Sequence, residues 1–154
     1  MTLVIKSHST KETEALAAKL ASKLAAGDVV ELRSDVGGGK TTFVKGLVAA
    51  LGSTDHVSSP TFTVSKQYTA KKYRIVHFDF YRLHEPTYVA DALAETMSDD
   101  KTITFIEWAG LVESVLPASR LIVDIQKHPS NESQRTFSFD DKTIDQHLTL
   151  DIPS

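Results

Sequence analysis

Residues 32–43 read Leu32-Arg33-Ser34-Asp35-Val36-Gly37-Gly38-Gly39-Lys40-Thr41-Thr42-Phe43, a glycine-rich run that ends in Lys-Thr. An apolar segment that starts at Val29 precedes the run, and a segment with helical spacing follows it as far as Leu51. This order of strand, glycine-rich loop, Lys-Thr and helix is the context that a phosphate-binding P-loop requires. The sequence therefore predicts a nucleotide site at the start of a helix, rather than a flexible turn.

Each part of the run has a physical role in binding phosphate. Consecutive glycines let backbone N–H groups converge on an anion, because no Cβ atom stands in the way. The N-terminus of the following helix adds unpaired N–H groups and partial positive charge. Lys40 can neutralise the β- and γ-phosphates, and the Thr41 hydroxyl can hold Mg²⁺. The predicted ligand is a nucleoside triphosphate with Mg²⁺.

The first position of the motif departs from the usual pattern. In G-x-x-x-x-G-K-[ST], Gly39 is the last glycine, but Ser34 stands where the first is expected. A serine there changes how the chain leaves the strand, whereas the phosphate chemistry lies at Gly39-Lys40-Thr41. We therefore expect Ser34 to affect nucleotide affinity and not the kind of site.

Length and composition are those of one globular domain. The 154 residues predict a single domain over 1–154, and 41% hydrophobic with 24% charged residues is ordinary for a soluble protein. The net charge of −3 does not favour direct binding of RNA or DNA. The absence of cysteine excludes disulfides, thiolate metal sites and cysteine nucleophiles. Neither a signal-peptide pattern nor an apolar run of roughly 18 residues is visible, so we expect a cytoplasmic protein without membrane contact.

Hydrophobic spacing predicts alternating strands and helices. The pattern S-x-x-E at Ser9–Glu12 is a capping box that opens a helix, and Gly27 is expected to end it. Residues 62–68 and 73–79 are β-rich and joined by a short polar link, which predicts an antiparallel hairpin. Residues 134–139 alternate and are expected at an antiparallel edge of the sheet. The other expected strands are 3–5, 29–33, 102–106 and 120–125. The other expected helices are 43–51, a short helix after a loop within 86–97, and 111–116.

Two carboxylates close predicted buried strands. Asp79 ends the strand 73–79, as a Walker-B carboxylate that holds Mg²⁺ directly or through water does; the alternative is an ordinary strand-end aspartate. Glu107 ends the strand that begins at Thr102, and in parallel α/β sheets ligands collect at the carboxyl ends of strands. Glu107 is therefore a candidate Mg²⁺ ligand or general base. Trp108 beside it is a candidate lid or partner contact, with simple packing as the alternative.

Other candidates lie outside these strand ends. Thr61 follows Ser59-Pro60 in the loop after the P-loop helix, where nucleotide switches carry a threonine that meets Mg²⁺ or the γ-phosphate; an ordinary polar turn fits equally well. Thr10, at the start of the first helix, is a candidate neighbour of the nucleotide. His77 is expected to be a core histidine, and Arg82 a surface or ion-paired residue.

Four motifs stand in order along the chain, at residues 35–43, 59–64, 77–83 and 106–108. Together they resemble the TsaE (YjeE) family, bacterial ATPases of tRNA threonylcarbamoyladenosine biosynthesis. The P-loop alone is shared by very many ATPases, whereas S-P-T-F, H-x-D-x-Y-R-L and I-E-W in this order are specific. The resemblance covers roughly residues 10–125.

The resemblance implies an α/β fold, namely a single P-loop NTPase-like domain with a mixed parallel and antiparallel sheet flanked by helices. It also implies Mg²⁺-dependent hydrolysis of ATP, weak for the chain alone and raised by partners. Those partners would be homologues of TsaD and TsaB, and tRNA would be met only through that complex. The carbamoyl transfer itself would belong to TsaD.

The resemblance also assigns residues. Lys40 would bind phosphates, Thr41 and Glu107 would serve Mg²⁺, Thr61 would be the switch threonine, and Asp79 would lie beside the nucleotide and be needed for hydrolysis. The expected nucleotide-binding residues are Thr10, Gly37, Gly38, Gly39, Lys40, Thr41, Thr42 and Arg135, with Thr10 and Arg135 at the nucleoside end. The chain departs from the family pattern at Ser34, Val36, Gly38, Phe80, Ala109 and Gln134, of which only Ser34 touches the phosphate chemistry.

Two other functions remain open. A small-molecule kinase on the same P-loop would need an acceptor pocket and usually an arginine-rich lid, and residues 83–100 offer neither. A non-hydrolysing nucleotide-binding scaffold would make Ser34 a sign of decay. Transfer of phosphate to an acceptor other than water identifies the kinase, and the nucleotide affinity of Lys40→Ala against the natural chain separates a live site from a decayed one.

Overall fold

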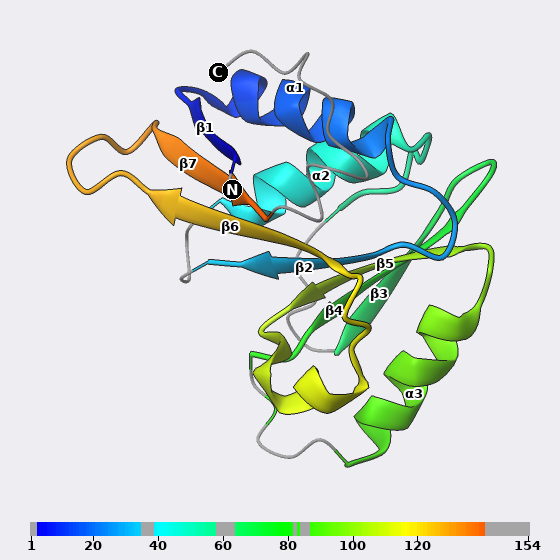
Figure 1. Cartoon of the computed structure of the whole chain (residues 1–154). Helices are drawn as coiled ribbons and strands as arrows, with labels where there is room; N and C mark the ends of the chain where they lie inside the picture. Colours follow the sequence, from blue (N-terminus) through cyan, green and yellow to red (C-terminus); the bar gives the residue numbers. More distant parts are fainter. Residues whose placement is uncertain (1–2, 35–38, 58–63, 82, 84–86, 141–154) are drawn as a thin grey trace.

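The computed structural model describes residues 3–34, 39–57, 64–81, 83 and 87–140, which form an α/β structure (Figure 1). In this part of the chain the strands make one seven-stranded sheet in the order β1-β7-β6-β2-β5-β4-β3. The strands are β1 (Leu3–Ser7), β2 (Val29–Arg33), β3 (Ser65–Thr69), β4 (Arg74–Asp79), β5 (Thr102–Glu107), β6 (Leu121–Lys127) and β7 (Arg135–Phe139). The predicted α/β class with a mixed sheet is confirmed.

Parallel strands occupy the centre of the sheet. Strand β2 pairs in parallel with β5 on one side and with β6 on the other, and β4 continues the parallel set beyond β5. Antiparallel pairs complete both sides, with β3 against β4 and with β7 between β6 and β1. The predicted hairpin is confirmed in its described part, residues 65–79. Because the central strands are parallel, the residues that end β2, β4 and β5 meet at one edge.

Helices cover both faces of the sheet (Figure 1). They are α1 (Thr10–Ala21), α2 (Lys40–Ala50), α3 (Thr87–Ser98) and the 3₁₀ helix η1 (Ala109–Val115). Helices α1 and α2 share a core with one face, while α3 and η1 share a second core with the other. Gly46 lets α1 approach α2 closely, since a Cβ atom there would lie 2.7 Å from the Cβ of Ala17. This close contact fixes α2, which begins at Lys40, beside α1.

Two expectations are wrong, one about where the first helix ends and one about the place of a strand in the sheet. The capping box opens α1, with the Ser9 hydroxyl accepting from Glu12 N–H, but the helix ends at Ala21 and not near Gly27. Gly27, at φ +92°, instead serves the turn into β2, where its N–H donates to the Thr102 carbonyl at 2.8 Å. Residues 135–139 are antiparallel as expected but lie inside the sheet, because β1 pairs outside them and Phe137 and Phe139 are fully buried.

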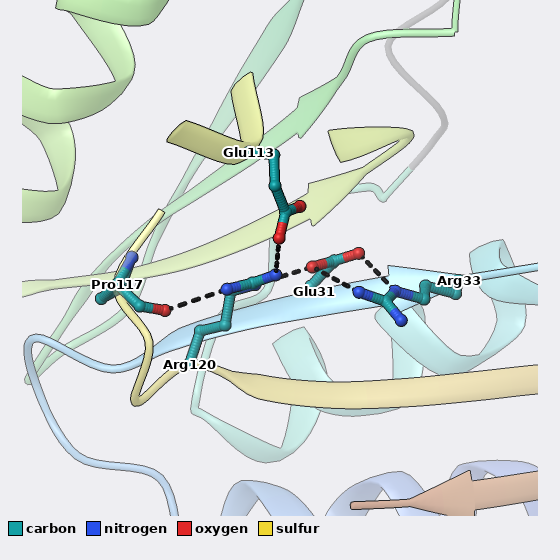
Figure 2. Close-up of polar contacts among 5 residues, drawn as sticks. All are labelled: Glu31, Arg33, Glu113, Pro117 and Arg120. Atoms are coloured by element: carbon teal, nitrogen blue, oxygen red, sulfur yellow. Dashed lines mark hydrogen bonds and ion pairs between the residues drawn. The ribbon is translucent and has the colours of Figure 1, made fainter. Parts of the chain in front are cut away.

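A cluster of charged side chains joins η1 to the sheet on the α3 face (Figure 2). Glu31 on β2 accepts from Arg33 Nε at 2.6 Å through one carboxylate oxygen and from Arg120 Nε at 2.7 Å through the other. Arg120 also donates to the Glu113 carboxylate at 2.6 Å and to the Pro117 carbonyl at 3.1 Å. We call these contacts the Arg120 cluster. It connects the strand that leads into the P-loop with the helix that follows Glu107 and Trp108.

The described helices are too short, or too polar, for any of them to be a membrane-spanning candidate.

Candidate functional site

The first turn of α2 presents Lys40 at the carboxyl edge of the parallel strands. Gly39 takes the left-handed conformation at φ +101°, which glycine adopts without strain, and its carbonyl accepts from Phe43 N–H at 3.2 Å. Lys40 follows and is nine-tenths buried. Its ammonium donates to the Ser34 carbonyl at 3.1 Å and lies 3.8 Å from Glu107 Oε1. Lys40 thus contacts the residue that follows β2 and the last residue of β5.

The two predicted carboxylates end neighbouring strands in the same register. Asp79 on β4 and Glu107 on β5 are paired across the parallel ladder, and Phe80 N–H donates to the Glu107 carbonyl at 3.1 Å. Glu107 is only 2% exposed, whereas Asp79 is half-buried. Because side chains alternate along a strand, both carboxylates lie on the face that α2 covers. The structure therefore brings Lys40, Asp79 and Glu107 together.

The surroundings of Asp79 favour its protonated form. Partial removal from water raises the pKa of Asp79, and the nearby negative charge of Glu107 raises it further. A hydrogen bond from Tyr81 N–H at 3.0 Å and the charges of His77 and Lys40 act in the opposite direction without cancelling the rise. Because burial and Glu107 disfavour the ionised form of Asp79, a cation bound nearby would stabilise that form.

Three further side chains surround this site, of which only Trp108 was a candidate from the sequence. His77 Nε2 lies 2.8 Å from Glu107 Oε2, and both side chains are buried. The Lys40 ammonium lies 4.6 Å from the centroid of the Trp108 ring, within reach of a cation–π contact. Trp108 stacks obliquely on Tyr81, with ring centroids 4.9 Å apart. His77 was predicted as core, and it is buried, but its partner is a site carboxylate.

The sequence held one signal for His77 and none for the Lys40–Trp108 contact. His77 and Asp79 are two residues apart on one strand, so an alternating pattern already places both on the same face. An exposure of 37% fits a lid or a partner contact at Trp108, whose left-handed backbone, at φ 56°, lies between β5 and η1. Packing of the ring over Lys40 follows only from the fold.

Arg135 lies against the glycine at the end of the P-loop. A Cβ atom at Gly39 would be 3.2 Å from Arg135 Nε, so the two are in close contact. Arg135 Nε is buried and has no hydrogen-bond partner in the described part of the chain. Ser7, which precedes α1, is paired in register with Arg135, and Thr10 is exposed at the start of that helix. The two residues assigned to the nucleoside end therefore lie at the same edge as Lys40.

The remaining predicted residues divide into two groups. Thr41 and Thr42 are half-buried in the first turn of α2. Thr61, Gly37 and Gly38 lie outside the described residues, as does Arg82.

The residues present fit Mg²⁺ bound together with phosphate rather than alone. Within the described ranges, no group of three or more histidine, cysteine, aspartate or glutamate side chains could hold a metal. Thr41, Asp79 and Glu107 offer oxygen donors, which Mg²⁺ prefers, and Mg²⁺ commonly takes one or two carboxylates, with waters and substrate phosphates as its other ligands. At such a site the phosphates of the nucleotide, with water, would supply the remaining Mg²⁺ ligands.

A pocket of about 400 Å³ lies elsewhere, lined by the turn before β2, the end of α3 and the segment after η1. Gly27, Met97 and Leu121 mark its walls. Gly27 and Leu121 stand at the opposite ends of β2 and β6 from the P-loop, so this pocket is separate from the Lys40 site.

The fold and the arrangement at Lys40 define a P-loop NTPase-like α/β protein. A family model described as "Threonylcarbamoyl adenosine biosynthesis protein TsaE" matches residues 7–137. The chain therefore belongs to the TsaE family, and the resemblance seen in its motifs is confirmed.

Individual relatives agree with this assignment. The tRNA threonylcarbamoyladenosine biosynthesis protein TsaE of Bacillus subtilis is 37% identical over 128 residues, which are 83% of this chain and 80% of that protein. The protein of the same name from Rickettsia conorii is 31% identical over 126 residues, 81% of this chain and 71% of that protein. The crystal structure of Bacillus subtilis YdiB superposes with a TM-score of 0.69 at 29% identity, covering 90% of this chain and 84% of that one.

Proposed function

We propose that this chain binds Mg-ATP, hydrolyses it slowly and serves tRNA threonylcarbamoyladenosine biosynthesis. The relatives that it matches carry the name of that pathway. The observation that carries the ATPase proposal is the convergence of Lys40, Asp79 and Glu107 at the start of α2. A buried lysine at a helix N-terminus beside two carboxylates suits the β/γ-phosphates of a nucleotide with its metal.

The residues of the site divide the work of hydrolysis. Lys40 would exchange its contacts with the Ser34 carbonyl and Glu107 for phosphate oxygens, helped by the N–H groups of the first turn of α2. Asp79 would accept a hydrogen bond from the attacking water and orient it. Mg²⁺, held by Thr41 and Glu107, would offset the phosphate charge. Arg135 and Thr10 would contact the nucleoside end.

Partner proteins complete the proposal. Homologues of TsaD and TsaB would bind the chain and raise its rate, and tRNA would be met only through that complex, since the net charge is −3. Tyr81 and Trp108 are 54% and 37% exposed beside the Lys40 site. A partner that docks there reaches Lys40 through the Trp108 ring. The proposed setting is the cytoplasm, and the carbamoyl transfer stays with TsaD.

Nucleotide binding tests the site directly. Lys40→Ala removes charge-assisted hydrogen bonds worth about 1.5–3 kcal/mol each, so we expect the affinity for Mg-ATP to fall about 10–100-fold. Lys45→Ala is the matched control, because Lys45 lies on the same helix but is exposed. Titration with a fluorescent ATP analogue measures both. Equal affinities for the two variants would refute a live phosphate site at Lys40.

Phosphate release tests the reaction and the partners. We expect slow release by the chain alone and faster release when the TsaD–TsaB pair is added. An unchanged rate would contradict the partner role. Radiolabelled γ-phosphate that appears on a small molecule instead of as free phosphate would favour the kinase, and binding without any release would favour the scaffold.

A further inference from the structure

The buried pair of His77 and Glu107 carries an inference beyond the roles given above. His77 Nε2 lies 2.8 Å from Glu107 Oε2, and the two side chains are each 2% exposed. His77 is on β4 and Glu107 is on β5, so the contact links two neighbouring parallel strands at their carboxyl ends. None of the roles in phosphate binding or hydrolysis uses His77.

The surroundings of the imidazole ring decide which nitrogen carries the proton. A carboxylate only accepts hydrogen bonds, so the short contact requires a proton on Nε2. The other nitrogen, Nδ1, is buried and has no partner among the described residues. The ring therefore directs an Nε2–H donor at Glu107.

This arrangement gives the two oxygens of Glu107 different tasks. Oε2 is engaged by His77, while Oε1 faces the Lys40 ammonium at 3.8 Å, beyond hydrogen-bond length. We propose that His77 is a positioning residue that fixes the Glu107 carboxylate, so that Oε1 alone is presented to the nucleotide and its metal. This proposal rests on the proposed function, since it assigns a task within the same site.

The proposal differs from a purely structural role in a way that can be measured. A ring that donates a hydrogen bond to a metal-ligating carboxylate sets the orientation of that carboxylate, and loss of such a contact commonly costs 10–100-fold in metal affinity or activity. A ring that only fills space would change stability and leave the metal dependence of nucleotide binding untouched.

Two substitutions separate these readings. His77→Gln places an amide N–H near the position of Nε2, whereas His77→Leu keeps bulk and removes the donor. We expect His77→Leu to lose about tenfold or more of the gain in ATP-analogue affinity that Mg²⁺ gives over EDTA, and His77→Gln to recover most of it. Thr104→Val is the matched control, because Thr104 is also buried on β5 and its hydroxyl has no partner in the described part.

The outcomes are decisive provided that thermal unfolding shows the variants folded. A His77→Leu variant with the natural Mg²⁺ dependence would overturn the proposal, and so would a His77→Gln variant that is no better than His77→Leu. Nitrogen-15 NMR of the ring in the nucleotide-free protein tests the contact by itself. We expect Nε2–H signals that shift in Glu107→Gln; ring signals that do not shift would overturn the proposal even where ATP binding is normal. Conversely, a natural chain that does not bind Mg-ATP would refute the proposed function. The NMR experiment would still test whether His77 donates to Glu107.

Discussion

Glu31 and Glu107 are both buried glutamates on neighbouring parallel strands, yet their surroundings differ. Their exposures are 4% and 2%. Glu31 stands beside Ile106 in the ladder, and Glu107 stands beside Leu32, so the two carboxylates point to opposite faces of the sheet. Glu31 has an arginine on each oxygen within 2.7 Å (Figure 2). Glu107 has a histidine on one oxygen and a lysine 3.8 Å from the other.

The Glu31 carboxylate is neutralised by two arginines in short contact, whereas the Glu107 carboxylate has no cation within hydrogen-bond distance of Oε1 among the described residues. Burial on its own would raise the pKa of Glu31, but hydrogen bonds from Arg33 and Arg120, with their charges, outweigh it and lower that pKa. The charged form of Arg120 is stabilised in turn: its burial is outweighed by hydrogen bonds to Glu31 and Glu113, which raise its pKa. Glu107 has no such pair of short cationic contacts, so it keeps an oxygen for a further cation. Complete pairing by two arginines thus fits a structural role for Glu31, and incomplete pairing fits the metal-binding role proposed for Glu107.

The largest expected effect is on stability at Glu31. Glu31→Gln removes the negative charge while Arg120, whose side chain is 9% exposed, stays buried. Breaking a buried ion pair at one partner costs about 3–5 kcal/mol, and we expect the low end because Arg120 keeps Glu113 and the Pro117 carbonyl. Urea unfolding followed by circular dichroism measures the loss.

Glu107→Gln is the matched comparison for that experiment. The amide keeps an oxygen for the His77 donor, and Lys40 keeps the Ser34 carbonyl and the Trp108 ring. We expect the free energy of unfolding to change by under about 1 kcal/mol, while ATP hydrolysis falls steeply. Similar losses of stability in the two variants would remove the distinction between the two glutamates.

Acid titration of stability comes next in size. The pKa of Glu31 is lowered in the folded chain, so the unfolded chain binds more protons there and stability rises with pH. This contribution is present above the unfolded pKa and is lost as pH falls through the folded pKa, in the acidic range below about pH 5. We expect the Glu31→Gln variant to lose less stability than the natural chain between about pH 6 and pH 3. Parallel curves would show that the Arg120 cluster does not hold Glu31 ionised.

The sequence predicted which residues lie at the strand ends, but not which side chains contact them. Asp79 and Glu107 were predicted because each ends a strand, and Lys40 because it follows the glycine run of a P-loop motif. Parallel strands then bring these positions to one edge. The contact between His77 and Glu107 joins residues 30 apart, and that between Arg120 and Glu31 joins residues 89 apart. Spacing along the chain carries no record of such pairs, since they depend on strand order and register. The place of β7 inside the sheet was missed for the same reason, because it depends on where β1 pairs.

The smallest expected effect concerns Asp79, and its sign is opposite to that of Glu31. The pKa of Asp79 is raised by burial and by Glu107, so the folded chain binds more protons there and its ionised form weakens the nucleotide-free protein. Asp79→Asn removes that charge and keeps an oxygen for the Tyr81 N–H, so we expect the melting temperature to rise by about 1–3 °C at neutral pH. Hydrolysis should be lost at the same time, because the amide lacks the carboxylate charge that is proposed to orient the attacking water. Differential scanning calorimetry in EDTA, beside phosphate release with Mg²⁺, measures both. A lower melting temperature for Asp79→Asn would show that the Asp79 charge stabilises the resting chain, and the contrast with Glu31 would then rest on Glu107 alone.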